Sequence, residues 1–134
     1  MDTMGPFRTS RARNRKILVI TDYFTRWAIA RPIPRETAEI VADILLDKIF
    51  TKFGAPEVIV SDQGSAFQSG VLRELFTDFR SKQVMSSPYH PQTNGLRERL
   101  NKTLAGMLAM YVSEKQQEWD EYIPFAVFAY NALR

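Results

Sequence analysis

Two neighbouring apolar runs dominate the first quarter of the chain. Residues 17–24 read ILVITDYF, and residues 26–33 read RWAIARPI. β-branched and aromatic residues favour strands, so this pattern predicts a hairpin with its turn near Thr25 and Arg26. Pro32 and Pro34 are expected to end the second strand, because proline has no N–H for the hydrogen-bond ladder.

A helical period follows the hairpin. From Ala38 to Phe53 the apolar positions recur every three or four residues, which predicts an amphipathic helix. Thr37 supplies its N-cap and Gly54 its stop. The apolar run that begins at Pro56 and ends at Asp62 then predicts a short strand.

Further helices and a further strand are predicted in the middle and at the end of the chain. A helix is expected over 71–80, with one apolar face made by Leu72, Leu75, Phe76 and Phe79. Residues 82–86 predict a short strand. A long helix from Leu96, capped by Asn94, carries its apolar stripe on Leu96, Leu100, Leu104, Met107, Leu108 and Tyr111.

A final helix is predicted from Pro124 to Leu133, since proline suits a first helical turn. Hairpin, helix, strand, helix, strand and helices together imply an α/β fold, with a mixed sheet of about five strands flanked by helices.

In the final helix Phe125 and Phe128 fall on a face different from that of Val127 and Tyr130. Its apolar surface therefore exceeds one core contact. The surplus packs either against residues that follow in a longer chain or against another subunit, and we expect a homodimer or a higher oligomer that uses this helix.

Composition narrows the class of protein. The chain has 134 residues, enough for one domain, and no cysteine, which excludes disulfides and thiolate metal sites. No uninterrupted apolar run approaches the ~18 residues of a membrane helix. The net charge of +3 mildly favours an anionic partner such as nucleic acid. Basic residues gather near the start, in either a solvated loop or a phosphate-contacting arm: Arg8, Arg11, Arg13, Arg15 and Lys16.

Two acids stand where a metal site is expected. Asp62 ends a predicted strand and Glu98 lies on the first turn of a predicted helix, with residues 63–97 between them. Carboxylates in such positions can converge on Mg²⁺, which takes one or two carboxylates together with substrate phosphates. A two-metal site needs a third acid. By position, Asp2 and Asp22 are the upstream candidates.

The sequence around these acids resembles the integrase catalytic core of retroviruses and long-terminal-repeat retrotransposons, in the Gypsy-like branch. The residues that carry this resemblance are Phe53-Gly54-Ala55-Pro56, Ser61-Asp62-Gln63-Gly64, Phe67, the loop SPYHPQTNG from Ser87 to Gly95, and Glu98-Arg99-Leu100-Asn101. The resemblance implies a ribonuclease-H-like fold. It implies that Asp2, just before Gly-Pro on the opening strand, completes the catalytic and metal-binding set with Asp62 and Glu98. Asp22 is then expected to end its strand at a turn.

The chemistry that the resemblance implies is phosphoryl transfer with two Mg²⁺ or Mn²⁺ ions. Water trims the DNA end of the element, and the exposed 3′-hydroxyl then attacks target DNA in the nucleus. Tyr89, Gln92, Asn94 and Lys102 are the residues expected to contact DNA. Alternatively, Lys102 is an ordinary lysine of the helix that faces solvent. His90 is expected to be structural or solvent-facing. The family's pattern is broken at Arg97, where a small or apolar residue is usual, and at Ala105, where a second lysine is usual. Without that lysine, the DNA face of this helix is expected to be less basic than in retroviral relatives.

The resemblance covers residues 1–134 as one catalytic core that looks truncated at both ends. The zinc-binding N-terminal domain and the C-terminal DNA- or chromatin-binding domain of the family have no counterpart in these residues. An alternative is a non-catalytic remnant, or a host-adopted module, that keeps the fold and binds DNA or protein. A free-standing nuclease of the same superfold is a third interpretation.

Overall fold

The computed structural model describes residues 1–86, 99, 101–106, 109 and 117–133. The chain divides into two units, each described separately below. The three-stranded unit comprises Asp2–Arg35 and Pro91–Arg134, and the two-stranded unit comprises Met1 and Glu36–His90. None of the described helices combines the length and the hydrophobicity needed to span a membrane.

The three-stranded unit contains the predicted hairpin and one further strand. Strands β1 (Asp2–Met4), β2 (Lys16–Thr21) and β3 (Ala28–Ile33) pair antiparallel in the order β1-β2-β3, so β3 is an outer strand. Pro32 and Pro34 were predicted to end the second strand: β3 passes through Pro32, and it ends at Ile33, directly before Pro34. An outer strand tolerates proline because one row of its backbone groups has no ladder partner.

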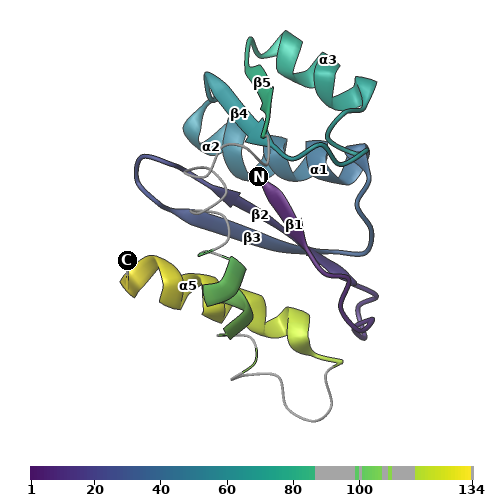
Figure 1. Cartoon of the computed structure of the whole chain (residues 1–134), viewed down its shortest axis with the longest axis vertical. Helices are drawn as coiled ribbons and strands as arrows, with labels where there is room; N and C mark the ends of the chain where they lie inside the picture. Colours follow the sequence, from purple (N-terminus) through teal and green to yellow (C-terminus); the bar gives the residue numbers. More distant parts are fainter. Residues whose placement is uncertain (87–98, 100, 107–108, 110–116, 134) are drawn as a thin grey trace. The chain divides into compact units, whose positions relative to one another are not determined.

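Helix α5 (Ile123–Leu133) packs against β3 within this unit and follows a short 3-10 helix, η2 (Trp119–Tyr122) (Figure 1). The side chain of Asn131 joins α5 to β3. Asn131 Oδ1 accepts from the Ala28 N–H at 2.9 Å, and Asn131 Nδ2 donates to the Ala28 carbonyl at 2.9 Å. Helix and strand thereby enclose the core of the unit, formed by Ile17, Val19, Ala28, Leu104, Trp119, Ile123 and Ala126.

The two-stranded unit has a β-α-β arrangement. Strands β4 (Val58–Ser61) and β5 (Lys82–Met85) pair in parallel, and α3 (Gly70–Asp78) connects them. Parallel neighbours need such a crossover, and here the helix also provides apolar cover. Leu72 and Phe76 of α3 are buried, while Phe79 is 45% exposed and contacts the ring of Phe50 at 4.9 Å between centroids.

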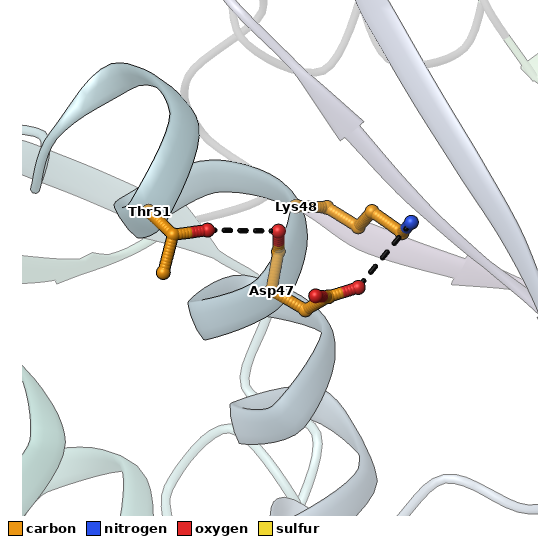
Figure 2. Close-up of polar contacts among 3 residues, drawn as sticks. All are labelled: Asp47, Lys48 and Thr51. Atoms are coloured by element: carbon orange, nitrogen blue, oxygen red, sulfur yellow. Dashed lines mark hydrogen bonds and ion pairs between the residues drawn. The ribbon is translucent and has the colours of Figure 1, made fainter.

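The helix predicted over 38–53 has the expected ends but an unexpected middle. It consists of α1 (Ala38–Leu45), a π-helical turn η1 (Leu46–Phe50) and α2 (Thr51–Phe53). The Thr37 side chain caps its start by accepting from the Ile40 N–H at 3.3 Å, as predicted. Figure 2 shows the π-helical turn, where Thr51 Oγ1 donates to the Asp47 carbonyl at 3.0 Å and Lys48 pairs with the Asp47 carboxylate at 3.3 Å.

Both kinds of strand pairing therefore occur, across five described strands. The prediction of an α/β fold with about five strands is confirmed. The final helix and the helix over 71–80 lie within a residue or two of their predicted bounds. Of the long helix from Leu96, residues 99, 101–106 and 109 are described as helical, and Leu104 is buried as its stripe requires.

Candidate active site

Asp62 follows the last residue of β4 and is held by its own turn. The buried Ser61 ends the strand, and the Asp62 Oδ1 atom accepts from the Gly64 N–H at 2.8 Å. A Cβ atom added to Gly64 would lie 2.9 Å from this Oδ1, so the carboxylate approaches the backbone where only glycine leaves room. The prediction that Asp62 ends a strand at a glycine turn is confirmed.

The loop after Asp62 is fixed by a buried aromatic ring. Phe67 is fully buried, and its N–H donates to the Gly64 carbonyl at 3.0 Å. From β5, Gln83 Nε2 donates to the Phe67 carbonyl at 2.6 Å and to Ser61 Oγ at 3.3 Å. A carboxylate on a loop tied down at several points keeps its position, which is what a catalytic ligand requires.

A second carboxylate approaches the same glycine, and the sequence did not single it out. Glu36 Oε1 lies 3.1 Å from the Cβ position of Gly64, within the same unit as Asp62. Glu36 precedes the helix cap Thr37, where an acid is ordinary, so no sequence signal marked it. Its approach adds negative charge beside Asp62.

Asp2 lies in the three-stranded unit, on β1 opposite Val19 of β2. Its Oδ2 atom accepts from Asn101 Nδ2 at 3.0 Å. The other polar atom of that amide, Asn101 Oδ1, is buried and has no hydrogen-bond partner in the described part of the chain. Buried acceptors in proteins are nearly always satisfied, so this oxygen is available to one further donor.

Asn101 lies in a stretch that carries the family resemblance, Glu98-Arg99-Leu100-Asn101, but no role was predicted for it. Its hydrogen bond to Asp2 makes it a positioning residue for a predicted ligand. Hard oxygen atoms such as those of the Asp2 carboxylate and the Asn101 amide are the donor type that Mg²⁺ prefers. The chemistry of these two groups is thus compatible with the predicted cofactor.

Asp22 has the structural role predicted for it. Its Oδ1 atom accepts from the N–H groups of Phe24 at 2.8 Å and Thr25 at 3.1 Å, in the turn between β2 and β3. The same turn is closed by the Arg26 N–H, which donates to the Asp22 carbonyl at 2.7 Å. Both bonds to one carboxylate oxygen are local, so Asp22 serves the hairpin.

The other predicted site residues are only partly visible. Lys102 is exposed on the helix of residues 101–106, as a DNA contact requires. Tyr89, His90, Gln92, Asn94 and Glu98 lie outside the described residues. Among the residues that are described, no three His, Asp or Glu side chains gather as a metal site. Asp2 and Asp62 belong to different units, and their juxtaposition with Glu98 stays a prediction.

Several proteins are similar in sequence to this chain. Residues 1–91 match the integrase core domain family. Gypsy retrotransposon integrase-like protein 1 of Rattus norvegicus is 30% identical over 134 residues, which is all of this chain and 26% of that protein. The Gag-Pol polyprotein of Feline leukemia virus is 34% identical over 113 residues, covering 84% of this chain and 7% of the polyprotein. The chain therefore spans only a small part of these relatives' length.

A solved structure shares the fold. One chain in the cryoEM structure of the simian T-cell lymphotropic virus intasome in complex with PP2A regulatory subunit B56 gamma matches with a TM-score of 0.80 at 25% identity. The match covers 99% of this chain and 48% of that one. The expected ribonuclease-H-like fold is thereby confirmed. On the family match over residues 1–91, the chain belongs to the integrase core domain family, of the retroviral and retrotransposon type.

Proposed function

We propose that this chain is the catalytic core of a DNA integrase that performs metal-dependent phosphoryl transfer, trimming the DNA ends of an element and joining them to target DNA. The observation that carries the proposal is the fixed carboxylate of Asp62, held by the Gly64 N–H at the end of β4 in a chain of the integrase core family. Its place of action would then be the nucleus, where target DNA resides.

Asp2, Asp62 and Glu98 would hold two Mg²⁺ or Mn²⁺ ions. When bound, such ions activate the attacking oxygen and stabilise the charge on the leaving oxygen. The chain's own residues place those ligands. The Asn101 amide holds Asp2 through its 3.0 Å hydrogen bond, and the Gly64 N–H holds Asp62. The exposed Lys102 would contact a DNA phosphate from the same helix as Asn101.

Oligomer formation is part of the same proposal, because joining two DNA ends needs two active sites. Phe125 and Phe128 of α5 are 64% and 74% exposed, while Val127 and Tyr130 are partly buried against the core of the unit. The predicted difference between the faces of this helix is thus present. The solved relative is described as part of an intasome, which supports assembly for this chain as well. A two-fold dimer burying at least ~1,000 Å² would cover both phenylalanines.

Metal binding tests the proposal without depending on activity. Mn²⁺ titration followed by electron paramagnetic resonance should show two bound ions in the wild-type chain. Asp62→Asn should weaken this binding by more than the roughly 10- to 100-fold that loss of a supporting residue costs. The same variant should abolish strand transfer between oligonucleotides.

Asp22→Asn is the matched control, since it also changes one Asp to Asn. An Asn oxygen can accept the same two turn hydrogen bonds, so metal affinity and strand transfer should be unchanged. Equal losses in both variants would reject Asp62 as a ligand. A chain that binds duplex DNA but no Mn²⁺ would instead support the alternative of a non-catalytic, DNA-binding module.

A further inference from the structure

The positive charge of this protein is concentrated in one hairpin. Residues 3–21 contain five basic residues and no Asp or Glu. The whole chain has 18 Lys and Arg against 15 Asp and Glu; without these five, 13 remain against 15, a net charge of −2. The five residues therefore account for the basic character of the chain, and four of them lie in the segment Arg8–Arg15, here called the arginine hairpin.

The tip of the arginine hairpin is a defined turn. The Ser10 N–H donates to the Asn14 carbonyl at 2.9 Å, and the Arg13 N–H donates to the Ser10 carbonyl at 2.9 Å, which leaves a three-residue loop. Arg13 adopts the left-handed conformation, with φ of 68°. Glycine is the residue that fits this position of such loops without steric cost. An arginine therefore stands here against the preference of the backbone.

The hairpin is anchored from inside by a buried carboxylate. Asp120 is 8% exposed, and its Oδ2 atom accepts from Ser10 Oγ at 2.6 Å and from Asn14 Nδ2 at 2.8 Å. The adjacent Trp119 Nε1 donates to the Arg8 carbonyl at 2.6 Å. A further bond joins the Arg11 N–H to the Gln117 carbonyl at 2.9 Å. Both flanks of the loop are thus tied to the segment before α5.

The anchored backbone leaves its arginine side chains in solvent. Arg8, Arg11, Arg13 and Arg15 are all exposed. Arg11 pairs with Glu118 at 3.4 Å, but both side chains are well exposed, so this ion pair is weak and exchangeable. The described part of the chain offers no ion-pair partner to the guanidinium groups of Arg8, Arg13 and Arg15.

We propose that the arginine hairpin is a preformed contact surface for the phosphate backbone of duplex DNA, in addition to the DNA contacts expected around Lys102. The inference rests on the proposed action on DNA. Guanidinium groups bind phosphates in bidentate fashion, and a backbone fixed beforehand loses little entropy on binding. The contact would be independent of base sequence, because phosphates carry no sequence information.

The side chains of the hairpin favour nucleic acid over a protein partner. Residues 8–15 read RTSRARNR and contain no large apolar side chain. Protein interfaces depend on buried aromatic or apolar anchors surrounded by a polar rim. A phosphate backbone needs only charge and hydrogen-bond donors, which this segment supplies at four arginines.

Fluorescence anisotropy with a labelled duplex oligonucleotide, in EDTA so that catalysis plays no part, tests the surface. Log K for DNA binding falls as log salt concentration rises. In the triple variant R8Q/R13Q/R15Q this fall should be less steep, with the magnitude of the slope reduced by about 2.7, at about 0.9 for each lost phosphate contact. The matched control R31Q/R35Q/R73Q removes the same charge from three exposed arginines elsewhere. The control should change the slope by less than about 1.

Asp120→Ala separates placement from net charge. Asp120 acts as a positioning residue, and alanine has no oxygen to accept from Ser10 and Asn14, so this variant should bind DNA more weakly although its net charge rises by one. Ser10→Ala removes one anchoring bond at constant charge and should weaken binding in the same way, with circular dichroism checking that both variants are folded.

Each outcome counts for or against the hairpin. Equal slopes for the two triple variants, or tighter DNA binding by Asp120→Ala, would overturn the inference while leaving the proposed function intact. Poly-glutamate bound as tightly as DNA, through the same three arginines, would overturn it in favour of an acidic protein partner. A wild-type chain that binds no duplex DNA at all would instead reject the proposed function.

Discussion

Replacing Asn131 by Ala should destabilise the protein strongly for so small a change. The Asn131 amide satisfies both backbone groups of Ala28, at 2.9 Å each, and Ala28 is 1% exposed. Truncation leaves a buried N–H and a buried carbonyl without partners, at about 1–3 kcal/mol each. Alanine regains roughly 0.5 kcal/mol of helix propensity. We expect a net loss of about 1.5–5.5 kcal/mol.

Thermal and urea unfolding measure this loss. With an unfolding entropy of about 2.1 cal/mol/K per residue, a loss of 3 kcal/mol lowers Tm by about 10 °C in a chain of this length. Ala132→Gln, at the exposed neighbouring position of α5, is the control and should stay within about 0.5 kcal/mol of wild type. A change below about 1 kcal/mol for Asn131→Ala would refute the view that the side chain satisfies buried groups.

Three further predictions concern the site, a cap and the helix surface. Gly64→Ala should displace the Asp62 carboxylate, whose Oδ1 lies 2.9 Å from the new Cβ, and weaken Mn²⁺ binding in the resonance titration; unchanged binding would count against the close approach. Thr37→Ala should cost about 1 kcal/mol in urea unfolding, while Thr37→Ser should cost little, because only the latter keeps the cap oxygen. Phe125→Glu/Phe128→Glu should convert a dimer into a monomer in sedimentation at micromolar concentration, and a wild-type monomer there would disprove the dimer.

Features that depend on neighbouring residues were predictable from the sequence. The hairpin, the cap at Thr37 and the strand that leads into Asp62 each follow from residue types within a few positions. The turn role of Asp22 was predicted with the help of the family resemblance. The π-helical turn over 46–50 was missed because the apolar spacing of an α-helix continues through it. Local pattern gives no sign of a single widened turn.

Features that depend on distant contacts were not predictable. The bond from Asn101 to Asp2 spans 99 positions, and the bonds from Asn131 to Ala28 span 103. Neither asparagine falls in a periodic pattern that would mark it, and the role of each depends on which backbone or carboxylate the fold places opposite. The family resemblance pointed to the carboxylates and the sequence to the glycine beside Asp62, but the bond that holds Asp2 emerged only from the structure.

The amide of Asn131 also bears on how this protein avoids self-association through its sheet. Backbone groups of a strand alternate in direction, so Ala28, Ala30 and Pro32 share the outer side of β3, away from β2. Asn131 occupies both groups at the first of these positions, and Pro32 has no N–H at the last. An incoming strand would find a full donor and acceptor pair only at Ala30 in this described strand. β3 is therefore a poor template for edge-to-edge aggregation.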